Sequence, residues 1–318
     1  MIRSLTLTAM AIGLVALVSP AQAQDRLPQI LEFAKKNSGK LRYSGVRKVQ
    51  MKFGPDMVQH TEYILRDGPR TRIWFPDEGS FRGQVIVETE KERRHYFPDR
   101  NQIDVMPARR SEYMMRIGRN GKDGRPRILY KVADGESIAG RGTTRVESSV
   151  ANGPLFMRMW IDPKTGLILK RVLYGKNGQP QATFEFTSID YTPNLKRSDF
   201  ELNIRGAKVI TPRDRLVDMV QRGGFQNVSL SPKDPYQLES VRIQRIENVS
   251  ALVQVYVKND GRVSLYQLKT PINPDRLRKS TRGERVSTHS WTKGGTSFVL
   301  IGDLPENKLR EIARRVGG

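Results

Sequence analysis

The residues that could carry out acid, base, nucleophilic or metal chemistry are few and widely separated. The chain contains three histidines, His60, His95 and His289, and their spacing is not that of a metal-binding motif. It contains no cysteine, which excludes disulfides, thiolate metal sites and thiol nucleophiles. The Gly-x-Ser-x-Gly pattern of serine hydrolases is also absent. We therefore predict a protein that binds something rather than an enzyme, with no metal and no cofactor.

Two other patterns could suggest chemistry. The Gly-Lys pairs at 121–122 and 175–176 superficially resemble a phosphate loop, but Asp123 and Asn177 stand where such a loop needs Ser or Thr. Two carboxylates held across a sugar could hydrolyse it, and the sequence does not exclude such a pair. A hydrolase of envelope polymers therefore stays open as a third class of function, although no residue pattern favours it.

Large apolar residues are abundant on the predicted strands of the first part of the chain. An open barrel with helices over its mouth encloses apolar volume, and methionines suit a cavity because the thioether adapts to varied ligands. An ordinary hydrophobic core would use the same residue types, so both interpretations stay open. The candidate ligand-binding residues are Tyr43, Ile64, Trp74, Tyr96, Met106, Met114, Trp160, Phe184 and Phe186.

The elements that must position these residues follow from periodicity and turns. Apolar residues at helical spacing predict helices over 27–37, 108–119, 214–222 and 305–316. Alternating residues between turns of Gly, Pro, Asn and Asp predict short antiparallel strands. These strands are expected at 43–53, 62–66, 70–75, 84–89, 94–97, 102–106, 128–132, 143–147, 156–161, 167–174, 182–191, 239–245, 251–257, 262–268, 285–291 and 297–301.

The predicted fold class is α+β, with two domains. A half-open antiparallel β-barrel covered by helices is expected over 24–200, followed by a linker over 201–212. A smaller α+β domain is expected over 213–318. The linker is predicted because turn residues and charges accumulate after Pro193.

The amino terminus and the overall charge indicate the compartment. Arg3, an apolar run over 5–18 and the small-x-small site at 21–23 predict a secretory signal peptide, cleaved after Ala23. We therefore expect an exported protein of the bacterial periplasm. The net charge of +22 favours anionic partners, but its Lys and Arg residues are spread along the chain, which argues against a nucleic-acid site.

Several segments resemble a known superfamily. The stretch 138–143 (IAGRGT), followed by 159–167 (MWIDPKTGL) and Lys170-Arg171, resembles the lipoprotein carriers of the periplasm, a LolA/LolB-like group. This pattern predicts a strand, a tight Asp-Pro-x-x-Gly turn and a returning strand. Segments 258–264 (KNDGRVS) and 299–305 (VLIGDLP) resemble the second domain of the RseB/MucB family of sigma-E regulatory proteins.

Further matches at 41–45 and 283–288 extend this resemblance to the RseB/MucB family over most of the chain after the signal segment. The resemblance implies a regulator in envelope-stress signalling. Its partners would be the periplasmic domain of a membrane anti-sigma factor and a lipid, lipoprotein or lipopolysaccharide ligand. The alternative is a periplasmic lipid or lipoprotein carrier, which needs the cavity but not the second domain. The sequence does not determine the oligomeric state.

Overall fold

The computed structural model describes residues 27–76, 79–108, 128–246, 248–258, 261–270 and 286–317. The expected signal segment 1–23, Met114 and nearly all of the helix expected over 108–119 lie outside these ranges. Within the described ranges, the helices are too short or too polar to cross a membrane.

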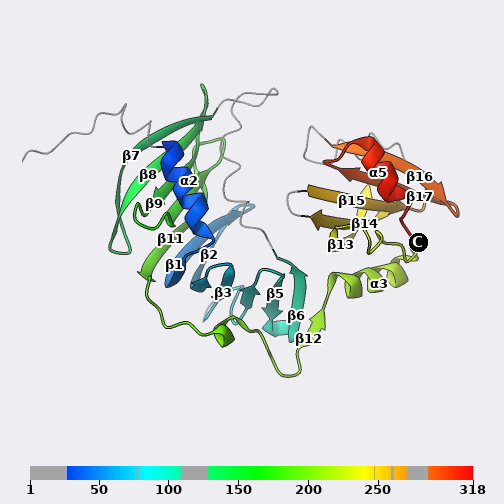
Figure 1. The fold of residues 1–318 in the computed structure, drawn as a ribbon, viewed down its shortest axis with the longest axis horizontal. Helices are drawn as coiled ribbons and strands as arrows, with labels where there is room; N and C mark the ends of the chain where they lie inside the picture. Colours follow the sequence, from blue (N-terminus) through cyan, green and yellow to red (C-terminus); the bar gives the residue numbers. More distant parts are fainter. Residues whose placement is uncertain are drawn as a thin grey trace, which may run out of the picture. The chain divides into compact units, whose positions relative to one another are not determined.

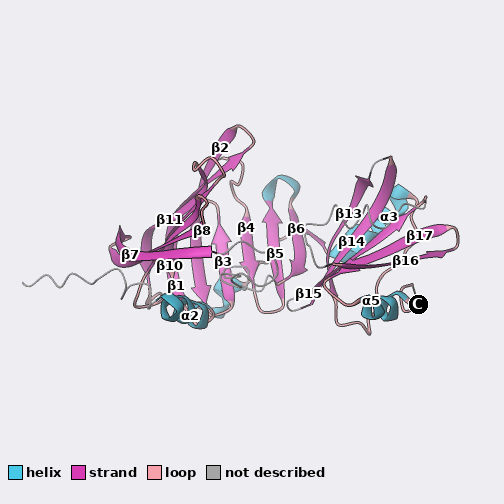
Figure 2. Cartoon of the chain, turned by 90° about the horizontal axis from the view of Figure 1, so that it is seen from above, coloured by secondary structure: helices cyan, strands magenta, loops and turns pink. Residues whose placement is uncertain are grey.

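Twelve strands are hydrogen-bonded into one sheet in the order β12-β6-β5-β4-β3-β2-β1-β11-β10-β9-β8-β7 (Figures 1 and 2). Strand β12 pairs with β6 in parallel, and the other registers determined in this sheet are antiparallel. Because β12 and β7 end the order, the sheet is open. The strands are β1(Arg42–Phe53), β2(Asp56–Asp67), β3(Arg70–Trp74), β4(Val85–Glu88), β5(Glu92–Phe97), β6(Gln102–Pro107), β7(Ile128–Ile138), β8(Arg141–Val150), β9(Leu155–Ile161), β10(Ile168–Tyr174), β11(Pro180–Asp190) and β12(Lys208–Ile210).

The chain divides into two compact units. The first unit comprises Met1–Ser38, Gln50–Met57 and Gly118–Phe186, and the second comprises Gly39–Val49, Val58–Ile117 and Thr187–Gly318. The first unit contains helix α2(Leu27–Ser38) together with strands β7 to β11 (Figure 1). The Asp-Pro-x-x-Gly turn described below lies against this helix.

The second unit contains a separate five-stranded antiparallel sheet, which we call the C-terminal sheet. Its order is β13-β14-β15-β17-β16, formed by β13(Gln237–Ile246), β14(Val249–Lys258), β15(Gly261–Leu268), β16(Ser287–Lys293) and β17(Thr296–Gly302). Helices α3(Pro212–Gly223) and α5(Glu306–Ala313) both pack on one of its faces, because Leu216 shares a buried cluster with Leu252 and Leu309 shares another with Leu300. Leu252 and Leu300 share that face through the strand register.

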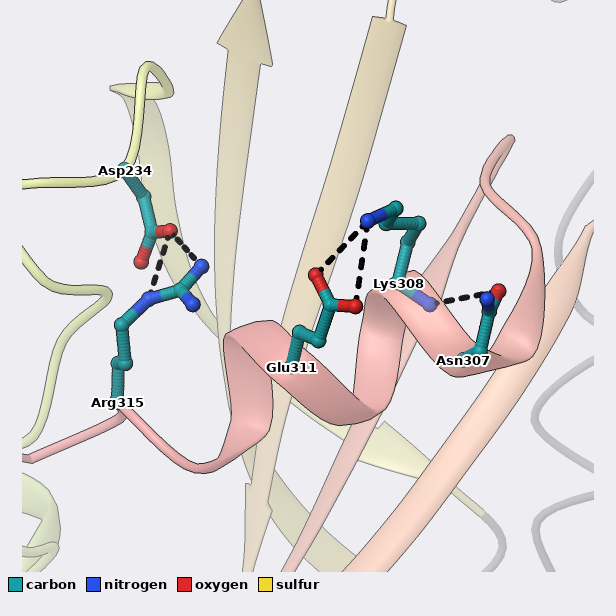
Figure 3. A network of polar contacts seen from close by, with 5 residues as sticks. All are labelled: Asp234, Asn307, Lys308, Glu311 and Arg315. Carbon is teal, nitrogen blue, oxygen red and sulfur yellow. Dashed lines mark hydrogen bonds and ion pairs between the residues drawn. The ribbon is translucent and has the colours of Figure 1, made fainter.

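A chain segment over 226–234 also covers this face and is held by buried polar groups. The Tyr256 hydroxyl donates to Gln254 Oε1 at 2.6 Å and accepts from the Leu230 amide at 3.1 Å. Figure 3 shows the guanidinium of Arg315, just after α5, donating to the buried carboxylate of Asp234, with an Nε to Oδ1 distance of 3.1 Å. The segment is therefore fixed to both the sheet and the end of the last helix.

Most of the predicted elements are confirmed. Helix α3 ends at Gly224, which adopts a left-handed φ of 60°, as the Gly223-Gly224 pair predicts. The first part of β2 and the second part of β7 extend beyond the predicted strands. The open sheet and the smaller second sheet agree with the predicted α+β class, while the helical cover of a barrel mouth stays a prediction. Residues 201–212, expected to be a linker, include β12 and the buried Leu202.

Candidate functional site

The turn that carries the lipoprotein-carrier resemblance joins its two sequence segments in the first unit. Asp162 is buried, and its Oδ1 accepts from the Lys164 amide at 2.8 Å. Its other oxygen accepts from Arg141 Nε at 3.2 Å, across from the turn between β7 and β8. Gly166 has a φ of 77°, and a Cβ there would lie 2.8 Å from the Cα of Ala34 in α2. The motif therefore positions α2 against the strands.

The candidate ligand-binding residues of the first unit lie on opposite faces of the sheet. In the pairing of β9, β10 and β11, Trp160 lies opposite Lys170, and Lys170 lies opposite Glu185. Phe184 and Phe186 are one position out of phase with Glu185, so their side chains point to the other face. We call this other face, with Val146 and Met159, the apolar face; Arg171 also lies on it, opposite Met159 and Phe184. Trp160 does not join Phe184 and Phe186 in one cavity wall.

The face around Trp160 is charged and slightly hollowed. We call it the charged face; a hollow of about 360 Å³ on it is lined by Glu136, Arg145, Arg158, Trp160, Lys170, Val172, Tyr174, Pro180 and Thr183. Lys170 Nζ lies 4.9 Å from the centre of the Trp160 ring and contacts Glu136 at 2.9 Å and Glu185 at 3.0 Å. Burial lowers the pKa of Lys170, but its hydrogen bonds to these two carboxylates raise it more, so the net shift is upward.

The candidates of the second unit are also divided between two faces. Ile64 pairs with Ile73 in β3, while the neighbouring Trp74 pairs with Tyr63 on the opposite face. Tyr96 lies on the Trp74 side, where it packs against a buried cluster of Val87, Ile103, Phe200 and Leu202. Met106 lies on the Ile64 side of β6. Within this unit, core packing explains Tyr96, whereas the other face combines apolar and polar groups.

Those polar groups form a buried cluster centred on Glu62. The Glu62 carboxylate contacts Arg47 at 2.5 Å through Oε2 and His60 Nε2 at 3.0 Å through Oε1. The His60 ring lies 4.6 Å from the Phe81 ring, and its Nδ1 has no hydrogen-bond partner among the described residues. Tyr43 is close by: burial raises the pKa of its hydroxyl, and the charges of Arg66 and Arg47 oppose that rise.

Sequence reasoning missed this cluster, because its members were considered one at a time. The available signal was the alternation of His60, Glu62 and Ile64 along a strand, which places three side chains on one face. Among the described residues, there is no group of three or more His, Asp or Glu side chains that could hold a metal ion.

The C-terminal sheet carries a second hollow, of about 430 Å³, beside the end of α3. Phe225, Ile243 and Lys269 are part of its lining, and Lys269 Nζ lies 5.4 Å from the centre of the Phe225 ring. Ile243 is 43% exposed. Among the described residues, the lining thus combines the apolar Phe225, Ile243 and Val249 with polar groups and the cation of Lys269.

No family model matches the chain, and no curated protein matches its sequence. Solved structures similar to the chain include the MucA/MucB complex of Pseudomonas aeruginosa, with 14% identity, 93% of this chain and 98% of that chain covered, and a TM-score of 0.41. An uncharacterized conserved protein of Thermus thermophilus has 16% identity over 58% of this chain and 98% of that chain, with a TM-score of 0.41. A LolA superfamily protein of Nitrosomonas europaea has 14% identity over 55% and 97%, with a TM-score of 0.28. These neighbours include the RseB/MucB and LolA-like groups that the sequence motifs resemble.

Proposed function

We propose that this chain is an exported regulatory protein of the bacterial envelope. It would hold the periplasmic part of a membrane anti-sigma factor and shield it from proteolysis. It would release that partner when a lipid, lipoprotein or lipopolysaccharide ligand is bound. Such release requires the ligand to have different affinities for the free and the complexed protein.

The observation that carries this proposal is the way the C-terminal sheet joins the two segments that resemble the RseB/MucB family. Val263, from segment 258–264, pairs with Gly302, from segment 299–305. A Cβ at Gly302 would lie 2.8 Å from the Arg262 carbonyl oxygen, so the close strand approach requires glycine there. The two segments are therefore one structural feature, and it belongs to a sheet that a simple carrier does not need.

The hollow at Phe225 and Ile243 is the surface that we propose for the anti-sigma factor. Its apolar residues, Phe225, Ile243 and Val249, would accept an apolar side chain, and Lys269 would pair with an acidic neighbour of that side chain. A buried apolar anchor with a polar rim is the usual arrangement at the centre of a protein interface.

Gel filtration tests the proposal directly. The full mature protein is mixed with the periplasmic segment of the anti-sigma factor encoded beside it, and we expect an earlier-eluting complex. Ile243→Ser should weaken that complex at least about tenfold. Val209→Ser is the matched control, since Val209 is a similarly exposed strand residue, 48% against 43%. Absence of any complex with the wild-type protein would contradict the proposal.

The second candidate function is a lipid or lipoprotein carrier, which the apolar face with Phe184 and Phe186 favours. It predicts acyl chains that co-purify with the protein, detectable by mass spectrometry of a mild extract. In the regulatory proposal, adding the same lipid to the complex should also displace the anti-sigma segment. Bound acyl chains without any anti-sigma complex would instead favour the carrier.

A further inference from the structure

The tip of the β1–β2 hairpin exposes two large apolar side chains. Phe53 ends β1 and Met57 lies at the start of β2, on either side of a turn in which Gly54 has a φ of 60°. Phe53 is 59% exposed and Met57 is 53% exposed, the highest values among the large apolar side chains of the described residues. Single exposed apolar residues are common on protein surfaces, but two together at one tip need a reason.

On the side of β3, the tip extends beyond the neighbouring strand. Strand β3 pairs with β2 only from Tyr63 to Asp67, so residues 56–62 of β2 run past the end of β3. Figure 2 shows this end of β2 as a projecting hairpin. A projecting convex tip cannot enclose a ligand, but it can insert into a lipid bilayer or into a groove of another protein.

The charges near the tip are mainly positive. Lys52 precedes Phe53 and is exposed. Lys48, which is also on β1, is exposed as well. Asp56 is the one acidic residue between Gln50 and Met57. The chain as a whole carries a net charge of +22, which attracts it to anionic surfaces.

We propose that this tip inserts into the headgroup region of a bilayer that contains anionic phospholipid. Aromatic and apolar side chains enter that region while lysines keep their ammonium groups at the level of the phosphates. A stable contact with another protein normally buries on the order of 1,000 Å² or more in total, and two side chains on a narrow turn provide much less. A weak, reversible lipid contact needs only a few apolar groups and favourable charge.

Vesicle flotation with the full mature protein tests this membrane contact. We expect binding to vesicles of phosphatidylglycerol and phosphatidylethanolamine, with much weaker binding to phosphatidylcholine vesicles and at high salt. The double substitution Phe53→Ser and Met57→Ser should lower the partition coefficient at least about tenfold. Leu129→Ser, at a 42% exposed residue of β7, is the matched control and should leave binding unchanged. Unchanged flotation of the double variant would overturn the proposal.

A second measurement reports insertion at the tip itself. Because the chain has no cysteine, Phe53→Cys and Leu129→Cys each create one site for an environment-sensitive dye. Vesicles should shift the emission of the dye at position 53 to the blue and leave that at position 129 unchanged. An unshifted emission at 53 would overturn the proposal.

Two outcomes would assign the tip to a protein partner instead. Loss of a dimer in gel filtration of the double serine variant would make the tip a contact between copies of this chain. Loss of the anti-sigma complex in that variant would make it the partner surface. Either result overturns the lipid proposal. Retention of the complex together with loss of flotation supports it, whatever the outcome of the Ile243→Ser test.

Discussion

Strands β7 to β11 and the C-terminal sheet are both antiparallel, but they bury their side chains differently. In β14 every residue from Ala251 to Tyr256 is buried, so both faces of this strand are covered. In β7 to β11 the apolar face, with Val146 and Met159, is buried, while the opposite face carries the charged residues around Trp160. The central strands of one sheet are buried on both faces, whereas on the charged face of the other the described residues form ion pairs and ring contacts over the strands.

The two sheets should therefore respond differently to substitution. A sheet filled on both faces cannot admit a ligand without displacing packed side chains, and such displacement is costly because interiors are close-packed. The C-terminal sheet is therefore expected to keep a fixed shape. The β7–β11 strands bury apolar side chains such as Met159 on one face and carry charged side chains such as Lys170 on the other.

The largest expected effect comes from creating a cavity in the filled sheet. Leu300→Ala should lower the free energy of unfolding by about 2–5 kcal/mol, because Leu300 of β17 is fully buried in a cluster with Leu265 of β15 and Leu309 of α5. Leu129→Ala, at an exposed residue of β7, should change it by less than about 0.5 kcal/mol. Urea titration of each variant gives both values. Equal losses at the two positions would show that the contrast between the sheets is wrong.

Alkaline pH should weaken the C-terminal sheet through Tyr256. Burial raises the pKa of this hydroxyl to about 12, although the hydrogen bond from the Leu230 amide and the charge of Arg213 act to lower it. The unfolded chain has the ordinary value near 10.0. The neutral folded form is thus fully favoured below pH 10, and up to roughly 3 kcal/mol of stability is lost as the pH rises from 10 to 12.

Tyr256→Phe is the matched variant for this pH dependence. At neutral pH it should cost about 1–2 kcal/mol, because the Leu230 amide and the Gln254 amide oxygen each lose a partner. Above pH 10 it should lose less stability than the wild type, as measured by urea titration across the pH range. Parallel pH profiles for the two proteins would contradict this assignment.

The strands were predictable from the sequence, whereas the faces of the candidate site were not. Alternation and turn residues are local signals, so the hairpin at 162–166 could be read directly. The face of a side chain depends on the register between strands, and β9 and β10 shift register between Ile168 and Lys170. A shift of one residue moves every following side chain to the other face, and this is why Trp160 could not be separated from Phe184 by spacing.

The strands of the C-terminal sheet were predicted from alternation, but their burial on both faces was not. Every residue from Ala251 to Tyr256 is buried, including the polar Gln254, and this depends on what packs against each face rather than on a local pattern. The cluster of His60 and Glu62 could not be found by type or motif, because it depends on Arg47 from the preceding strand.

In the first unit, the contact of α2 with the turn should be sensitive to the size of residue 166. Gly166→Ala and Gly140→Ala both place a side chain at a left-handed φ, 77° and 74° respectively, so they share the same backbone cost. Only at Gly166 does the new Cβ meet the backbone of Ala34, which should add about 1–3 kcal/mol of destabilisation. Thermal unfolding of the two variants measures the difference, and equal losses would mean that α2 does not rest on this turn.

The smallest effect is expected on the charged face, at Lys170. Lys170→Met keeps the aliphatic stem over Trp160 and removes the ammonium group, so stability should fall by less than about 1 kcal/mol. Because the folded-state pKa of Lys170 is raised, this difference from the wild type should be full below the ordinary value of 10.5 and disappear as the pH rises above the folded value. Urea titration at several pH values measures it, with the exposed turn residue Lys176→Met as the control. A loss of stability comparable to that of Leu300→Ala would mean that the ion pairs of Lys170 contribute as much to the free energy of unfolding as the buried side chain of Leu300.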